Sequence, residues 1–205
     1  MSEIKDKILS GSETLFMRYG FKSITMDDVA RELGVSKKTL YQFFADKNDL
    51  VNQCVEHYLE SINAMCNVIT EAKDRDAITV MIDIADSVNS MIRQINPSSM
   101  FDLKKYFKHA WDKLENDRQG YIRKSIEENF EMGIKKGLYR KDLNKEVTTN
   151  IYIFLSGMLT DPDRYPGSDL NISNMYLEII KYHLRSICTP KGNELLEEKL
   201  KQLKK

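Results

Sequence analysis

Hydrophobic residues recur at helical spacing along almost the whole of this chain of 205 residues. Apolar positions three and four residues apart mark one face of an α-helix. The pattern predicts helices over 3–19, 47–72, 77–95, 111–136, 145–159 and 172–187, and a shorter helix that Ser99 caps. Only 4 prolines and 9 glycines interrupt it. The sequence therefore predicts an all-α protein.

Two short helices joined by a tight turn are predicted between residues 25 and 47. Val29, Ala30 and Leu33 share one face of the first helix. Gly34 follows, where helices commonly end in the left-handed conformation that glycine adopts without strain. Ser36 suits the N-cap of the second helix, because its hydroxyl can accept from free backbone N–H groups. This spacing indicates a helix-turn-helix, whose second helix enters the DNA major groove.

The exposed side of the second helix carries groups suited to DNA. Lys37 and Lys38 offer phosphate donors, and the amide of Gln42 can pair with a base edge. Two lysines on a short helix would by themselves indicate only a solvated face. With the surrounding turn and apolar spacing, the pattern favours DNA binding.

Charge changes this picture in one respect. The chain has 31 Lys and Arg against 31 Asp and Glu, so its formal net charge is +0. Without a global positive field, DNA binding must come from a local patch, for which Lys37, Lys38 and Lys47 are the candidates. Neutrality is also the one feature that favours an alternative function, a dimeric helical module that binds a ligand or protein without specific DNA recognition.

A resemblance to a known family lies in the stretch GFKSITMDDVARELGVSKKTLYQFFADKNDLV. This stretch resembles the DNA-binding domain of the TetR family of bacterial transcriptional regulators, over about the first quarter of the chain. The resemblance implies a DNA-binding domain at 1–46 and a helical dimerisation and effector domain at 47–205. It implies a ligand-responsive repressor that binds a pseudo-palindromic operator as a homodimer. The DNA-contacting residues that it implies are Thr25, Ser36, Lys37, Lys38, Thr39, Tyr41, Gln42 and Lys47.

Five successive apolar residues at 151–155 set one helix apart. A buried strand would have the same composition, but the flanks extend the segment to helical length. Because the run covers every side of a helix, one side needs a second partner. Together with the stripe of helix 172–187, it predicts a four-helix dimer interface related by a two-fold axis. The predicted interface residues are Ile151, Phe154, Leu155, Met158, Met175, Ile179, His183 and Ile187.

Methionine and aromatic residues between positions 81 and 130 are candidates for the walls of an effector pocket. Methionine suits both ordinary cores and adaptable pockets, so helix packing is the simpler interpretation of any single residue. The family resemblance raises the expectation of a pocket for a small apolar effector. The candidate residues are Met81, Met91, Tyr106, Phe107, Trp111 and Phe130.

Other chemistry lacks support in the sequence. The histidines at 57, 109 and 183 and the 3 cysteines have no metal-ligand spacing, and no nucleophile motif or phosphate-binding glycine loop occurs. No enzyme activity, cofactor or metal is therefore expected. No apolar run reaches membrane-spanning length and the N-terminus lacks a signal-peptide core, so we expect a cytoplasmic protein. Pro190 and Gly192 are expected to end helix 172–187, and the tail from Glu194 to Lys205 is either a docked amphipathic helix or a frayed end.

Overall fold

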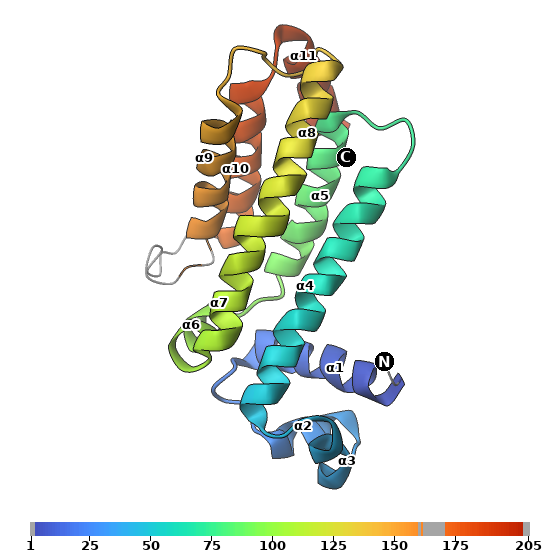
Figure 1. Ribbon diagram of the computed structural model, residues 1–205, viewed down its shortest axis with the longest axis vertical. Coiled ribbons are helices and arrows are strands. Elements are labelled where there is room, and N and C mark those ends of the chain that lie inside the picture. The colour runs from blue at the N-terminus through green and yellow to red at the C-terminus, as the bar shows by residue number, and fades with distance from the viewer. Residues whose placement is uncertain (1–2, 160, 162–170, 203–205) are drawn as a thin grey trace. The chain divides into compact units, whose positions relative to one another are not determined.

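A computed structural model describes residues 3–159, 161 and 171–202, and these residues form helices and loops with no β-strand (Figure 1). The predicted all-α fold is confirmed. The helices are α1 (Glu3–Tyr19), α2 (Met26–Leu33), α3 (Lys37–Phe43), α4 (Lys47–Glu71), α5 (Ala77–Ile92), α6 (Pro97–Tyr106), α7 (Lys108–Asp117), the π-helical turn η1 (Arg118–Ile122), α8 (Arg123–Lys135), α9 (Lys145–Met158), α10 (Ile172–Ile187) and α11 (Pro190–Gln202).

The chain divides into two compact units. Unit 1 comprises Met1–Asn63 and Gln94–Asp117, and therefore holds α1 to α3, the first part of α4, α6 and α7. Its core joins the helix-turn-helix to the helices around it, since Phe16 of α1, Val29 of α2, Leu40 of α3 and Leu50 of α4 are all fully buried in one cluster. The DNA-binding helices thus share their hydrophobic core with α6 and α7.

Unit 2 comprises Ala64–Arg93 and Arg118–Lys205. α5 packs on α8 and α10, and α9 packs on both α8 and α10. A buried polar chain crosses this core: the Tyr139 hydroxyl donates to Asn129 Oδ1 at 3.0 Å, and Asn129 Nδ2 donates to the Ala77 carbonyl at 2.9 Å. The predicted boundary between a DNA-binding and an effector domain at residues 46 and 47 stays a prediction, and the two packing units divide further along, within α4, between Asn63 and Ala64.

The local signals for the helix-turn-helix are confirmed. The Thr25 hydroxyl accepts from the Asp28 backbone N–H and the Asp28 carboxylate accepts from the Thr25 N–H, which completes a capping box at α2. Gly34 has φ 65° and ψ 32°, the left-handed conformation that ends α2. Ser36 caps α3 by accepting from the Thr39 N–H at 3.0 Å. The turn geometry therefore follows from the residues within it.

The start of α6 differs from the prediction. Asn96 caps this helix, with Pro97 at its first turn, while Ser99 lies inside it. The Ser99 hydroxyl instead donates to the carbonyls of Phe16 and Met17, at 3.1 and 3.0 Å. Those carbonyls belong to the last turn of α1, which leaves acceptors without intrahelical partners. Ser99 therefore connects two elements far apart in the chain.

The long helix predicted over 111–136 is divided in the structure. α7 begins earlier, at Lys108, and the π-helical turn over residues 118–122 separates it from α8. A π-helical turn shifts the hydrogen-bond register from i+4 to i+5 and so redirects the helix faces that follow. Apolar spacing alone does not reveal this shift, because the residues on either side keep helical periodicity.

The C-terminal segment is a docked helix. Pro190 stands at the first position of α11, where its missing N–H removes no intrahelical bond, so it begins this helix instead of ending α10. Gly192 lies inside α11, and its N–H donates to the Thr189 hydroxyl at 3.1 Å. Leu196 is 0% exposed in the core of unit 2. The last three residues of the predicted tail, 203–205, lie outside the described residues. Within the described part of the chain, no helix is long and apolar enough to cross a membrane.

Candidate nucleic-acid interface

α3 has one buried face and one solvent face, as a recognition helix requires. Leu40 is fully buried in the core of unit 1, and Phe44 is buried at the end of the helix. Lys38 and Gln42 are exposed, and Tyr41 is 51% exposed. Two amine or amide groups and a phenol hydroxyl therefore project from one short helix, where they are available to phosphates and base edges.

The predicted hydroxyl contacts are already engaged inside the protein. Thr25 Oγ1 lies 2.6 Å from Asp28 Oδ2, and the same hydroxyl caps α2. Ser36 Oγ lies 2.8 Å from Thr39 Oγ1 while it caps α3. A hydroxyl that accepts from the backbone can still meet a phosphate, but the main role of these residues in this structure is to fix the two helices.

Ion pairs on α2 and α3 cancel much of the positive charge near the predicted DNA face. Lys37 Nζ lies 2.6 Å from Asp27 Oδ2, and Arg31 lies 2.5 Å from Asp28 Oδ1. The hydrogen bonds from Thr25 and Arg31 lower the pKa of Asp28 to about 2, so this carboxylate stays charged. Residues 26–43 contain three acidic and three basic side chains. The helix-turn-helix is therefore close to neutral.

Lys47, which is predicted to contact DNA, engages other groups of unit 1. Its Nζ donates to the Lys22 carbonyl at 3.1 Å and lies 5.5 Å from the centroid of the Phe107 ring. Burial lowers the pKa of this amine. Lys47 thus packs its ammonium against the Lys22 carbonyl and the Phe107 ring. Its contact with DNA stays a prediction.

The predicted dimer interface includes a face of α9 and α10 that carries apolar side chains at the surface. Phe154 is 54% exposed and Ile151 is half-exposed, while Met158 and Ile179 are partly exposed. Val147 precedes Ile151 by four residues, at helical spacing, and is half-exposed. The other residues on this face are Leu155 and Met175, which are partly exposed, and Tyr182, which is exposed.

Two residues predicted for the dimer interface lie in the core of unit 2. His183 is 4% and Ile187 is 2% exposed. The His183 ring packs 4.9 Å from the Tyr152 ring, measured between centroids. These side chains point inward, so they have almost no surface to offer a second subunit. Val147 and Tyr182 were missed, although their spacing of four and three residues from Ile151 and Ile179 is a signal in the sequence.

The six candidates for an effector pocket do not come together. Tyr106, Phe107 and Trp111 belong to unit 1, where Trp111 is buried in the core and Phe107 packs against it. Met81 and Phe130 are buried in the core of unit 2, and Met91 is partly buried there. Each buried member fills a hydrophobic core. The interpretation as ordinary packing therefore describes them better than a shared pocket.

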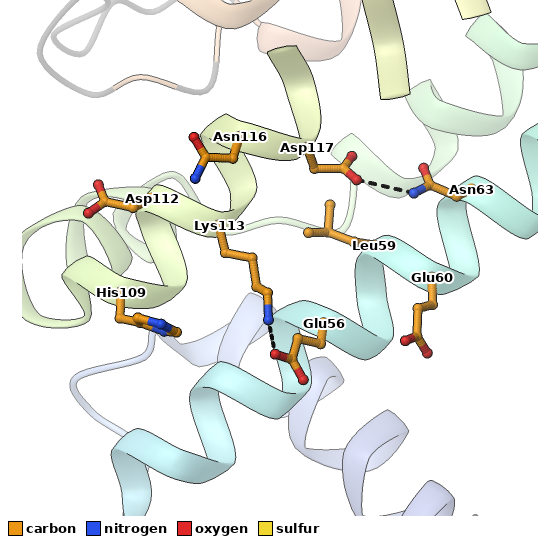
Figure 2. Close-up of a pocket in the computed structure, with 9 residues that line it drawn as sticks. All are labelled: Glu56, Leu59, Glu60, Asn63, His109, Asp112, Lys113, Asn116 and Asp117. Carbon is orange, nitrogen blue, oxygen red and sulfur yellow. Dashed lines mark hydrogen bonds and ion pairs between the residues drawn. The ribbon is translucent and has the colours of Figure 1, made fainter. Parts of the chain in front are cut away.

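A groove of about 670 Å³ lies in unit 1 between α4 and α7 (Figure 2). Figure 2 shows Lys113 of α7 reaching toward Glu56 of α4, with which it forms an ion pair, and Asn63 donating to Asp117 at 3.2 Å. Its lining is Glu56, Leu59, Glu60, Asn63, His109, Asp112, Lys113, Asn116 and Asp117. Only one of these side chains is aliphatic, and none of the six candidates for an effector pocket is among them.

Among the described residues, no group of three His, Cys, Asp or Glu side chains lies close enough together to hold a metal ion. The three cysteines are buried and unpaired with one another. His57 instead lies 2.5 Å from Glu13, so it links α4 to α1 within unit 1. Burial raises the pKa of Glu13, and the contact with His57 opposes that rise. This pair has a structural role in holding the helices together.

Comparison with known proteins supports the interpretation of the N-terminal helices. Residues 8–54 match the family model described as bacterial regulatory proteins, tetR family. The chain is 26% identical over 163 residues to an uncharacterized HTH-type transcriptional regulator, YvaF, of Bacillus subtilis, a match that covers 78% of this chain and 82% of YvaF. It is 33% identical over 60 residues to IcaR of Staphylococcus aureus, a negative transcriptional regulator of a biofilm operon, which covers 29% of this chain and 32% of IcaR.

Solved structures share the fold over nearly the full length. A transcriptional regulator from Cytophaga hutchinsonii matches with a TM-score of 0.70 and 18% identity, over 89% of this chain and 97% of that protein. SCO4454, a TetR-family transcriptional regulator from Streptomyces coelicolor, matches with a TM-score of 0.64 and 18% identity, over 90% and 96%. The helix-turn-helix and the helices that follow it are thus a known arrangement.

Proposed function

We propose that this chain, which belongs to the TetR family of bacterial transcriptional regulators, is a repressor that binds a pseudo-palindromic operator as a homodimer. The observation that carries the proposal is the solvent face of α3, where Lys38, Tyr41 and Gln42 project while Leu40 anchors the helix from behind. A second helix held in this way can enter the major groove. Repression is proposed because IcaR, a relative of this chain, is described as a negative transcriptional regulator.

Within this proposal, the side chains of α3 divide the work of binding. Lys38 and Tyr41 hold phosphates, which sets affinity and position without reading sequence. Gln42 pairs with a base edge, for which adenine offers a matching donor and acceptor. Thr25 and Ser36 cap the N-termini of α2 and α3, and in the complex they lie beside the DNA backbone. Lys37 contributes after it exchanges its Asp27 partner for a phosphate.

The proposed dimer forms through the α9–α10 face, defined as Val147, Ile151, Phe154, Leu155, Met158, Met175, Ile179 and Tyr182. A half-exposed phenylalanine among aliphatic neighbours is the kind of surface that a second subunit covers. Two helices from each subunit then build a four-helix interface with two-fold symmetry. That symmetry requires the operator to be a pseudo-palindrome.

We also propose that a small effector controls DNA binding, because a response to a ligand fits the family. The six Met and aromatic candidates give it little support, because Trp111 is buried in the core of unit 1 whereas Met81 and Phe130 are buried in the core of unit 2. We also propose that the protein has no catalytic activity and works in the cytoplasm, where bacterial DNA lies. The alternative function, a helical module without specific DNA recognition, draws its support from the neutral helix-turn-helix.

Selection of bound sequences from a random duplex pool tests the proposal. We expect a pseudo-palindrome whose half-sites lie about one helical turn apart or somewhat more. Gln42→Ala should relax the preference at one position of each half-site, by on the order of 1–3 kcal/mol if the amide pairs with a base through two hydrogen bonds. Lys38→Ala should weaken binding to all sequences equally and flatten the salt slope by roughly one unit per lost phosphate contact.

The control is Asn48→Ala, at an exposed position in the first turn of α4 that is not assigned to DNA. It should keep both specificity and salt slope. Enrichment of no sequence from the pool would favour the alternative module. Unchanged specificity in Gln42→Ala would mean that a different face of α3 reads the bases.

A further inference from the structure

We propose that a basic and aromatic surface on α6 is a second DNA contact, which holds phosphates that flank the half-site. This surface, named here the α6 patch, consists of Lys22, Phe101, Lys104, Lys105 and Tyr106. The inference rests on the proposed DNA-binding function and extends it beyond the helix-turn-helix. The α6 patch belongs wholly to unit 1, like the recognition helix.

The need for a second contact follows from the charges on α2 and α3. Those helices carry equal numbers of acidic and basic side chains, and Lys37 pairs with Asp27. Lys47 directs its ammonium to the Lys22 carbonyl. DNA affinity depends on the number of phosphates that lysines and arginines neutralise. A helix-turn-helix that is neutral as a whole needs cations from its surroundings.

The α6 patch supplies cations held over aromatic rings. Lys22 Nζ lies 4.7 Å from the Tyr106 ring centroid and 3.1 Å from the Tyr106 hydroxyl oxygen. Lys105 Nζ lies 5.1 Å from the Phe101 ring and 5.5 Å from the Tyr106 ring. Cation–π contacts of this kind restrain flexible lysines while the ammonium stays in water.

Exposure and electrostatics both support binding of an anion. Phe101 is 44% and Tyr106 is 41% exposed, so the rings lie at the surface with the lysines. The hydrogen bond from Lys22 and the nearby charge of Lys105 lower the pKa of the Tyr106 phenol. The α6 patch holds three lysines, and the carboxylate of Asp102 is bonded to it, since it accepts from the Lys22 N–H. A positive surface of this size can hold phosphates in the way that basic patches do.

Hydrogen bonds fix the α6 patch to the DNA-binding helices. The Lys22 N–H donates to Asp102 Oδ2 at 2.9 Å, which ties the turn before α2 to α6. The Asn96 N–H donates to the Met17 carbonyl at 2.8 Å, beside the bonds of Ser99 to the end of α1. Lys47, at the start of α4, meets the same turn through the Lys22 carbonyl. The α6 patch therefore borders the turn that leads into α2, in which Lys22 precedes Thr25 of the proposed DNA interface by three residues.

This position is the reason for choosing DNA as the occupant. An acidic peptide or an anionic lipid surface would satisfy the same lysines, but neither accounts for a patch bonded to the turn that leads into the helix-turn-helix. A duplex that passes beyond the half-site brings further phosphates at regular spacing. The α6 patch should therefore act on DNA length and not on operator sequence.

The test compares two duplexes that contain a pseudo-palindrome selected from a random pool. One ends at the edge of the palindrome and the other extends by about ten base pairs on each side, close to one helical turn. The variant is Lys104→Gln/Lys105→Gln. Its control is Lys141→Gln/Lys191→Gln, which removes the same charge from two exposed lysines of unit 2.

The wild type and the control should bind the long duplex on the order of tenfold more tightly than the short one at low salt. Lys104→Gln/Lys105→Gln should lose this preference, keep its affinity for the short duplex, and lose roughly 0.9 unit of salt slope for each phosphate contact removed.

Equal binding of the wild type to both duplexes overturns the α6 patch as a DNA contact, while the proposed function stands because the palindrome is still bound. Absence of any selected palindrome overturns both. If Lys104→Gln/Lys105→Gln loses the same affinity for both duplexes, the α6 patch is also overturned as a contact to flanking phosphates. The two lysines would then act on the half-site or on folding. Binding of the wild type to phosphatidylserine vesicles, without a length preference on DNA, would assign the surface to lipid.

Discussion

Two buried polar residues of unit 2, His183 and Tyr152, have pKa values that burial moves away from their ordinary values. His183 is surrounded by the core of this unit, next to the ring of Tyr152. Burial lowers the pKa of His183 to about 4, from an ordinary value of 6.5, because the charged imidazolium loses its hydration there. Burial likewise raises the pKa of Tyr152 to about 12, which keeps its phenol neutral.

The first prediction is a loss of stability in mild acid that His183 causes. The folded state holds this histidine neutral, whereas the unfolded chain binds a proton below a pH of about 6.5, so stability is complete above that pH and falls as the pH approaches 4. Between pH 7.5 and pH 5 the loss should be roughly 2 kcal/mol per subunit.

Urea unfolding at fixed protein concentration and several pH values measures this loss. His183→Gln should remove roughly that much of the pH dependence, although it will also lower stability at neutral pH through altered packing. The exposed His109 gives the matched control, since His109→Gln removes one histidine without changing the core. A wild-type curve that is flat between pH 7.5 and 5 would mean that His183 is more hydrated than its burial indicates.

The helices of the DNA-binding motif are defined by their ends. Thr25 and Asp28 complete the capping box of α2, Ser36 caps α3, and Asp46 accepts from the Asp49 N–H at 2.8 Å at the start of α4. Each cap satisfies N–H groups that a helix leaves without partners. The element boundaries near DNA therefore depend on a few short-range hydrogen bonds.

The second prediction separates backbone strain from steric clash at Gly34. A Cβ atom built on Gly34 would meet nothing within 4 Å, so only its left-handed conformation resists substitution. Gly34→Asn should cost less than about 1 kcal/mol, since asparagine tolerates this conformation. Gly34→Val should cost on the order of 1–3 kcal/mol and reduce operator binding, because a β-branched residue is strained there.

Thermal unfolding and operator affinity, measured for both variants, check that Gly34→Asn is less damaging than Gly34→Val. Equal effects of asparagine and valine would show that the turn can change its conformation. A large effect of Gly34→Asn on binding with unchanged stability would instead place this position in contact with DNA.

At the scale of the whole molecule, the α9–α10 face is an apolar surface that the described residues of a single chain leave exposed. Of the residues predicted for the interface, His183 and Ile187 are buried in the core of unit 2, whereas Val147 and Tyr182 lie exposed on the same two helices. The α9–α10 face that we propose as the interface therefore includes the second pair in place of the first. The apolar run at 151–155 accordingly divides between the core, through Tyr152 and Ile153, and the surface.

The third prediction is that Phe154→Glu produces a folded monomer. A glutamate there would bury a charge without a partner in the proposed four-helix interface, a change that typically costs several kcal/mol. Sedimentation velocity measures the oligomeric state, and far-ultraviolet circular dichroism confirms that the helices persist.

Val68→Glu adds the same charge at an exposed apolar position of α4, outside the α9–α10 face, and should remain dimeric. If Phe154→Glu also sediments as a dimer, the subunits associate through another surface.

The sequence alone determined what depends on neighbours a few residues apart. Apolar spacing set the helices, and the caps and Gly34 set the helix-turn-helix, since both signals act within about one or two helical turns. The resemblance of that stretch to the TetR family follows from the same local residues. Most of α3's exposed chemistry was therefore visible before the fold.

Only the tertiary structure decided which partners meet across long distances in the chain. Lys22 and Tyr106 are 84 residues apart, and nothing local signals their contact. The same holds for Lys47, whose ammonium turns toward the Lys22 carbonyl, and for His183, which faces the core. Helical spacing identifies a face but not what will cover it, because coverage depends on how separate helices pack. For this reason the buried Met and aromatic residues that look like one pocket in sequence, Met81, Trp111 and Phe130, belong to two different cores.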